Sequence, residues 1–154
     1  MAANRAYFGV RTGVTNTTSA ANPLFGITGG TTARVSIYDI ISGSDATPAD
    51  NYAEFAIRRL STAGTTSATF TPTALDPADP AASAVFATTW SAQPTVTASS
   101  DIWSVSQNQR ATFRWVAAPG GELLIPATAA AGLGMMAVGS NATATYQFSV
   151  YWME

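Results

Sequence analysis

The final segment of the chain has the clearest alternation of hydrophobic and polar positions. Within residues 142–154, Tyr146, Phe148, Val150 and Trp152 occupy alternate positions, mostly with Thr, Gln and Ser between them. Period-two alternation of aromatic and β-branched residues predicts a half-buried β-strand. A helix would scatter these side chains around its axis and bury no consistent face. We therefore expect this strand to pair with earlier segments and to complete the hydrophobic core.

Shorter segments of the same kind recur along the chain, separated by turn-forming residues. They predict strands at residues 6–11, 33–41, 53–60, 66–71, 84–90, 102–107, 111–116, 122–125 and 133–138. The only candidate for helical structure is one turn near residues 81–84. Short turns every 8–12 residues or so are typical of sandwiches and barrels. The sequence predicts an all-β, single-domain antiparallel β-sandwich or jelly roll of about eight to ten short strands.

Loop lengths suggest how some of these strands pair. Segments 53–60 and 66–71 are joined by a short loop that contains Gly64, and segments 102–107 and 111–116 by Asn-Gln-Arg. Short loops with residues of this kind are typical of β-hairpins. We expect each pair of segments to form a hairpin.

The first 31 residues lack this regular pattern. One short strand candidate is followed by a segment rich in Thr and Asn and then by Gly26, Gly29 and Gly30. Such segments are often ordered only by a partner. We expect residues 1–31 to form an N-terminal arm or loop segment with one short strand, and residues 32–154 to form the sandwich domain. An ordered first strand of the sandwich is the alternative.

Charged residues are scarce, and this narrows the range of partners. They make up 10% of the chain, against roughly 25% in an average protein. The net charge of −2 provides no basic surface for nucleic acid. No apolar run approaches the ~20 residues of a membrane span, and the N-terminus lacks the apolar core of a signal peptide. A surface so poor in charge is weakly protected against association, and burial between subunits would explain it.

Several classes of catalytic chemistry lack their essential residues. The chain contains no His, Cys or Lys, which excludes Ser-His-Asp and Cys-His nucleophiles, zinc sites built on His or Cys, and a P-loop lysine. Its carboxylates lie mostly in turn-like segments, as at Asp45, Asp50, Asp76 and Asp79. They show neither a paired glycosidase arrangement nor the spacing of a calcium loop. We expect no enzymatic activity, no catalytic residues, no cofactor and no metal site.

The aromatic residues suggest both a core and an interface. Trp90, Trp115 and Trp152 lie on the apolar sides of their predicted strands, which favours core positions, whereas Trp103 fits this pattern less well. If the tryptophans were exposed instead, they could form a platform for stacking sugars.

A second aromatic group lies near the N-terminus. There, Tyr7 and Phe8 are flanked by arginines. The candidate partner interface consists of Arg5, Tyr7, Phe8, Arg11 and Trp103.

The last two-thirds of the chain contains a series of short motifs in a distinctive order. They are Leu75-Asp76-Pro77, Asn108-Gln109, Phe113-Arg114-Trp115, Pro119-Gly120-Gly121-Glu122-Leu123 and Val150-Tyr151-Trp152-Met153-Glu154. In their order and spacing, residues 53–154 resemble small virion proteins of tailed bacteriophages, the decoration or cement proteins that cap the capsid.

This resemblance implies a jelly-roll-like fold and a structural function. It implies homotrimers at threefold or quasi-threefold positions on the outer surface of the virion, bound to the major capsid protein after synthesis in the host bacterial cytoplasm. The protein would decorate and stabilise the capsid without catalysis. The alternative is a carbohydrate-binding β-sandwich module of a phage fibre or spike. The position of the aromatic side chains distinguishes the two, because a sugar platform must be exposed.

Overall fold

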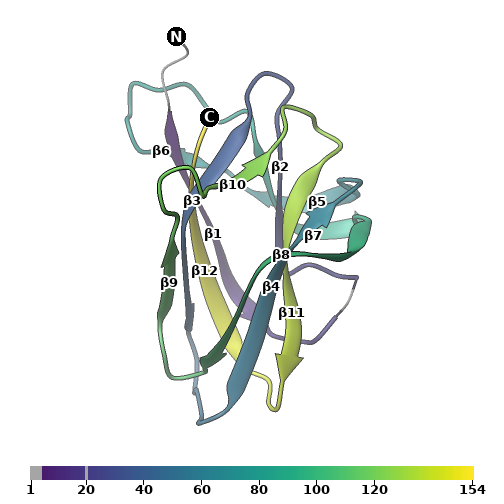
Figure 1. Cartoon of the computed structure of the whole chain (residues 1–154), viewed down its shortest axis with the longest axis vertical. Helices are drawn as coiled ribbons and strands as arrows, with labels where there is room; N and C mark the ends of the chain where they lie inside the picture. The colour runs from purple at the N-terminus through teal and green to yellow at the C-terminus, as the bar shows by residue number, and fades with distance from the viewer. Residues whose placement is uncertain (1–4, 20) are drawn as a thin grey trace.

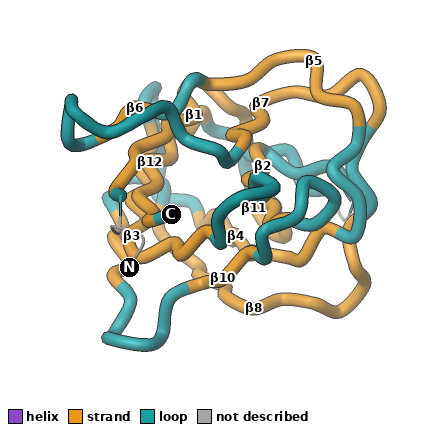
Figure 2. The backbone as a smooth tube through the Cα atoms, turned by 90° about the horizontal axis from the view of Figure 1, so that it is seen from above, coloured by secondary structure: helices purple, strands orange, loops and turns teal. Residues whose placement is uncertain are grey.

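The computed structural model describes residues 5–19 and 21–154, which form two antiparallel β-sheets packed against each other (Figures 1 and 2). This confirms the prediction of an all-β sandwich. No helix occurs in the described residues, so the helical turn predicted at residues 81–84 is wrong. Accordingly, none of the described segments is a helix of the length and hydrophobicity needed to cross a membrane.

One sheet, sheet A, contains both ends of the described chain. Its strands are β1 (Ala6–Thr15), β3 (Val35–Ser44), β6 (Thr73–Ala74), β9 (Phe113–Val116), β10 (Leu123–Ile125) and β12 (Thr145–Met153). Their order is β10-β3-β12-β1-β6, and β9 pairs with β3. The predicted terminal strand β12 therefore lies at the centre of the sheet.

The other sheet, sheet B, is built from the middle of the chain and one N-terminal strand. Its strands are β2 (Phe25–Thr28), β4 (Tyr52–Leu60), β5 (Thr65–Phe70), β7 (Val85–Ala92), β8 (Val96–Asn108) and β11 (Gly132–Ser140). Their order is β5-β7-β2-β11-β4-β8. All ten segments predicted to be strands contain a strand in the structure, and the short strands β2 and β6 are additional.

Both predicted hairpins are wrong. β4 pairs with β8 and β11, whereas β5 pairs with β7. β8 pairs with β4 in sheet B, but β9 pairs with β3 in sheet A. The segment between β8 and β9 crosses from one sheet to the other, and Trp103 of β8 then meets Trp115 of β9 edge to face, with ring centroids 6.5 Å apart. Contact between aromatic side chains across the two sheets replaces the local hairpin.

The predicted N-terminal arm is also wrong for the described residues, because β1 and β2 are integral strands. β1 lies between β12 and β6 in sheet A, and β2 lies between β7 and β11 in sheet B. Tyr7, Phe25 and Ile27 are each less than 5% exposed. These buried side chains make residues 6–19 and 21–28 part of the sandwich, so the alternative of an ordered first strand holds. The prediction for residues 1–4 lies outside the described residues.

A glycine explains why the N-terminal segment does not look like a core strand in the sequence. A Cβ atom on Gly9 would lie 2.5 Å from the Phe86 ring and 3.0 Å from the Trp152 ring. Gly9 therefore allows β1 to approach the aromatic core closely, which no larger residue could do without displacing the rings.

The core is formed mainly by aromatic and branched side chains from both sheets. Tyr146, Phe148, Val150 and Trp152 of β12 are all 0% exposed, as the alternation predicted. The Trp152 ring is stacked with the Tyr7 and Phe86 rings, in each case at a centroid distance of 6.2 Å. Burial of one such aromatic side chain contributes several kcal/mol, so β12 holds the two sheets together.

Two buried amide side chains hold the turn between β11 and β12. The Asn16 amide donates to the Ser140 hydroxyl and to the Ala142 carbonyl, and its oxygen accepts from the Ala144 N–H at 2.7 Å. The Gln109 amide donates to the same Ala142 carbonyl at 2.9 Å. Both residues are 1% exposed. Buried polar groups must be paired, so these bonds fix this end of the sandwich.

The Glu154 side chain connects the end of β12 to the segment before β7. Its carboxylate accepts hydrogen bonds from the Ser83 N–H and hydroxyl at 2.8 and 2.7 Å, from the Ala84 N–H at 3.0 Å and from the Trp152 indole N–H at 3.1 Å. Partial burial favours the neutral acid, but these hydrogen bonds outweigh it and lower the pKa of Glu154 below its usual value.

Replacing Glu154 by alanine should destabilise the protein by about 1–3 kcal/mol, because buried donors lose a charged acceptor. Because the pKa of Glu154 is lower in the folded protein than in the unfolded chain, its ionised carboxylate stabilises the fold at pH values above the unfolded pKa of about 4.3. This stabilisation is lost as the pH falls through the folded pKa. The difference between wild type and E154A in urea unfolding should therefore shrink below pH 4 or so. Glu122→Ala is the control, because the Glu122 carboxylate accepts one long bond of 3.3 Å from Gly120. A constant difference at every pH would contradict this role of the carboxylate.

Candidate interaction surfaces

The solvent-facing side of sheet A carries hydrophobic and aromatic side chains where a sandwich usually carries polar ones. We define the sheet A face by Phe8, Tyr38, Val116, Leu124 and Tyr151. Val116 and Leu124 are 56% and 41% exposed, and the three aromatic residues are half-buried. The aromatic rings form a row, because Tyr151 lies 5.1 Å from Phe8 and 6.4 Å from Tyr38 between ring centroids. Contiguous apolar patches of this kind mark interaction sites.

Strand register places these side chains together. Phe8 lies opposite Tyr151 in the pairing of β1 with β12, and Asp39 lies opposite both Tyr151 and Val116. The register shifts between Tyr151 and Trp152, so β3 has one more residue than β12 at this point. This bulge brings Tyr38 and Asp39 to the same side of the sheet, whereas regular alternation would separate them.

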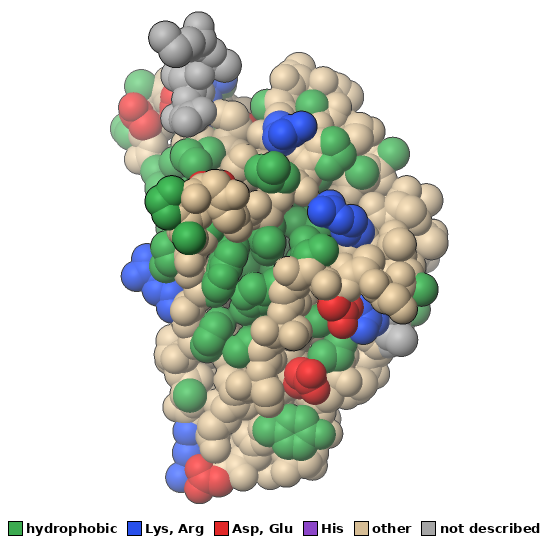
Figure 3. All heavy atoms as spheres, viewed as in Figure 1, with side chains coloured by type: hydrophobic (Ala, Val, Ile, Leu, Met, Phe, Trp, Pro, Cys, Tyr) green, Lys and Arg blue, Asp and Glu red, His purple; other side chains and the backbone are tan. Residues whose placement is uncertain are grey.

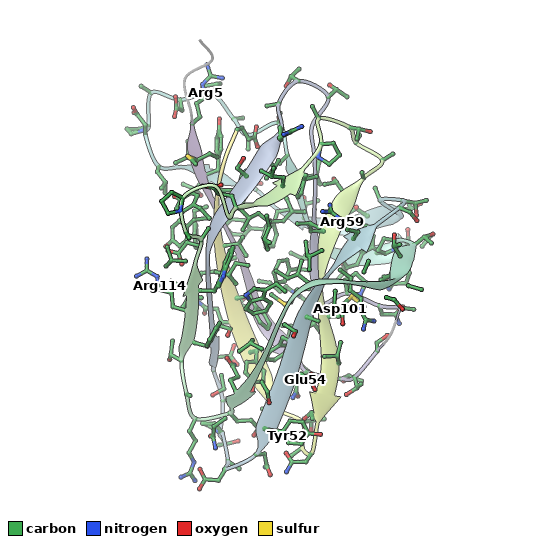
Figure 4. All side chains as sticks on the ribbon, viewed as in Figure 1. Arg5, Tyr52, Glu54, Arg59, Asp101 and Arg114 are labelled. Carbon is green, nitrogen blue, oxygen red and sulfur yellow. The ribbon has the colours of Figure 1, made fainter. Side chains whose placement is uncertain are left out.

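An arginine–carboxylate pair lies within the sheet A face. The Arg114 guanidinium donates to both carboxylate oxygens of Asp39, with its Nε 3.1 Å from each. The Asp39 side chain is 6% exposed, whereas that of Arg114 is 60% exposed. Figure 4 shows Arg114 pointing away from the sandwich. The buried carboxylate thus holds an exposed, planar cation beside the aromatic row, and arginine and tyrosine are the residue types enriched at binding hot spots.

The Tyr38 hydroxyl is neutral at physiological pH. Burial raises the pKa of Tyr38 above its ordinary value, and the charge of Asp39 adds to this effect. Tyr38 can therefore donate a hydrogen bond to a partner while its ring remains in the apolar row.

A second apolar surface lies at the open edge of the sandwich, between β9 and β8 (Figure 3). We call it the edge strip and define it by Trp103, Val105, Phe113 and Trp115, all of which are half-buried. The Trp103 ring lies 5.9 Å from Phe113 and 6.5 Å from Trp115. Charged residues flank the strip, with Arg114 on one side and Arg59, Asp101 and Glu54 on the other (Figure 4).

The two surfaces meet at β9. Phe113 and Trp115 of this strand belong to the edge strip, whereas Arg114 and Val116 project to the sheet A face, because successive residues of a strand point to opposite sides. A partner that covers β9 could therefore contact both surfaces at once.

The five residues predicted to form one interface are distributed over different parts of the molecule. Tyr7 is 1% exposed and belongs to the core, so its predicted interface position is wrong. Phe8 lies on the sheet A face and Trp103 in the edge strip. Arg5 is exposed and forms an ion pair with Asp79 at 3.5 Å. Arg11 lines a pocket on the side of the sandwich where β1 and β7 lie.

The tryptophans are less buried than the sequence predicted. Trp152 is in the core as expected, whereas Trp115 is only partly buried and packs against the core. Trp90 lies outside the main core, where it is close to Gly26 and donates its indole N–H to the Ala63 carbonyl at 3.1 Å. Because Trp90, Trp103 and Trp115 are all half-buried, their positions do not separate the structural interpretation from the carbohydrate-binding one.

No protein-family model, curated protein or solved structure matches this chain. The described residues also contain no cluster of three or more acidic residues that could hold a metal ion.

Apart from Phe8 and Trp103, the residues of these surfaces are not interface candidates in the sequence. Tyr38, Arg114 and Tyr151 are the most important of them. The sequence carries a signal for both tyrosines, because Tyr38 and Tyr151 fall on the polar sides of otherwise alternating strands. An aromatic residue at an outward-facing position is informative in such a strand. Arg114 had no comparable signal, because its partner Asp39 is distant in the sequence.

Proposed function

We propose that this protein is a non-catalytic structural component of a bacteriophage virion, which decorates the capsid and stabilises it by binding the major capsid subunits. The observation that carries the proposal is the sheet A face, where aromatic and aliphatic side chains surround the Arg114–Asp39 pair. The resemblance of residues 53–154 to decoration proteins suggests that the partner is the major capsid protein. The scarcity of charge supports attachment through apolar contacts and hydrogen bonds.

The sheet A face has the composition expected of a protein-binding surface. Interfaces combine buried aromatic residues and arginine at the centre with a polar rim. Tyr38, Tyr151 and Phe8 supply the aromatic centre, and Arg114 supplies directional donors. A standard interface buries about 1,600 Å² in total. The edge strip would add to the buried area, because it adjoins the sheet A face at β9.

Stabilisation of the capsid would follow from mass action. A protein that binds the assembled shell but not the separated subunits shifts the equilibrium toward the shell, by about 2.7 kcal/mol per site at 100 times its Kd. Contacts across a boundary between subunits must break before those subunits separate. We propose that the protein acts as homotrimers at threefold or quasi-threefold positions, so that each copy contacts neighbouring subunits.

Adding the protein to capsids that lack it should raise their thermal disruption temperature, measured by release of packaged DNA. Because few charges are available, about 0.5 M salt should weaken the effect only slightly. Bovine serum albumin at the same concentration is the control. If bare and decorated capsids release DNA at the same temperature, the protein is not a stabiliser.

A further inference from the structure

A pocket of about 370 Å³ lies on the side of the sandwich where β1 and β7 are found. It is formed by the end of β1, by described residues between β1 and β2, and by the second half of β7 with the residue that follows it. Its lining combines hydroxyl and amide side chains, among them Thr17, Asn22, Thr88 and Gln93, with Arg11 and with the apolar residues Val14, Pro23, Leu24 and Trp90. Its volume lies in the lower part of the range for small-molecule sites, about 300–1,000 Å³. None of the described residues lining it is acidic.

Arg11 is in an unusual position for a cation. It pairs with Phe148 in the β1–β12 ladder, and Phe148 is 0% exposed between the sheets. Directly opposed residues share a face, so the Arg11 side chain starts on the inner side of sheet A. β6 pairs with β1 only at Tyr7 and Phe8, so near Arg11 no strand of the described residues covers this edge of sheet A. The side chain can therefore reach the pocket.

The Arg11 guanidinium is incompletely paired. Its Nε atom is buried and has no hydrogen-bond partner within residues 5–19 and 21–154. By contrast, Arg5, Arg58, Arg110 and Arg114 each form an ion pair with an aspartate. A buried, unpaired donor of a charged group is costly, and an anion bound to the guanidinium would offset this cost with charge-assisted bonds.

We propose that this pocket binds an acidic sugar, with the carboxylate on Arg11. Sugar binding in this pocket would not depend on capsid binding or on the sheet A face. A carboxylate would pair with the Arg11 guanidinium, and no acidic residue of the described lining would repel it. The hydroxyl and amide side chains offer partners for sugar hydroxyls, and the half-buried Trp90 offers an apolar surface for a pyranose ring. An acidic peptide could supply a carboxylate, but it would leave most of these polar side chains unmatched.

The test is isothermal titration of the full chain with D-glucuronate, D-glucose, acetate and N-acetyl-glutamate N-methylamide. We expect millimolar binding of glucuronate, with glucose and acetate each at least tenfold weaker. Equal affinity for glucose and glucuronate would overturn the role of the arginine. Binding of acetate or of the glutamate derivative as tight as that of glucuronate would overturn the assignment to a sugar. No binding of glucuronate would overturn the proposal as a whole.

Variants of the same chain locate the site. Arg11→Gln should reduce glucuronate affinity at least tenfold and abolish the preference over glucose. Arg34→Gln is the matched control, because Arg34 is exposed and does not line the pocket. Wild-type affinity in R11Q, or equal losses in both variants, would place the ligand elsewhere. Thermal melting of R11Q shows whether this variant is folded. If R11Q does not fold, the comparison of ligands on the wild-type protein still tests the proposal.

Discussion

Replacing Gly9 by valine should strongly destabilise the protein. A Cβ atom at this position would lie 2.5 and 2.9 Å from two atoms of the Phe86 ring and 3.0 Å from the Trp152 ring. Both rings are 0% exposed, so neither can move without displacing other core residues. Overpacking of a core commonly costs about 1–3 kcal/mol and sometimes more, and valine adds two further methyl groups. Total stability is about 5–15 kcal/mol. We expect G9V to be insoluble, or to melt at least 10 °C or so below the wild type.

Gly43→Ala is the matched control for this experiment. Gly43 also lies in a strand of sheet A, but the nearest atom to an added Cβ would be 3.4 Å away, on the side chain of Thr112. G43A should therefore melt within a few degrees of the wild type. If G9V melted as the wild type does, β1 would not be packed against the core, and the N-terminal segment would be an arm after all.

Replacing Tyr151 by aspartate should reduce binding to capsids at least 100-fold, while the protein remains folded. Tyr151 lies at the centre of the aromatic row, between Phe8 and Tyr38. Loss of a hot-spot aromatic residue costs 2 kcal/mol or more, and a negative charge buried in an apolar interface adds a desolvation cost of about the same size, so the sum is about 4 kcal/mol. Co-sedimentation of the purified protein with capsids, over a range of concentrations, measures the change.

Gln147→Asp is the control for charge. Gln147 is exposed on the same strand and alternates in phase with Tyr151, but it lies outside the aromatic row. Q147D should bind within a few fold of the wild type, and melting curves should verify that both variants are folded. If Y151D binds capsids as tightly as the wild type, the sheet A face is not the attachment surface.

The strands could be predicted because their alternation is local. In β12, each buried residue is separated from the next by one outward-facing residue, so the pattern is complete within the segment. Strand pairing could not be predicted in the same way. The short loop between β8 and β9 suggests a hairpin, but contact between Trp103 and Trp115 across the sheets is a long-range effect that loop length does not encode.

The sequence is misleading about the N-terminal segment for a related reason. A glycine in the sequence indicates conformational freedom, whereas Gly9 in the structure is required by the closeness of the Phe86 and Trp152 rings. That requirement comes from segments far away in the chain. The same applies to Tyr7 and Phe8, because neighbouring residues in a strand face opposite sides. The pair was recognised as apolar, but only the sheet pairing shows that Tyr7 faces the core and Phe8 faces outward.

The candidate surfaces were only partly visible in the sequence. Phe8 and Trp103 were expected at an interface, and they lie on the sheet A face and in the edge strip. The bulge that brings Tyr38 beside Tyr151 depends on the register between β3 and β12, which no local pattern specifies. Likewise, the pairing of Arg114 with Asp39 requires β9 to lie beside β3.

Electron cryo-microscopy of capsids decorated with this protein tests the central proposal most directly. We expect β-sandwich density in trimers at threefold or quasi-threefold positions on the outer surface, with the sheet A face turned toward the major capsid subunits and Tyr151 within the contact. Capsids without added protein should lack this density. Particles that carry no such density at saturating protein, or trimers whose sheet A face is turned to solvent, would contradict the proposed function or its proposed surface, respectively.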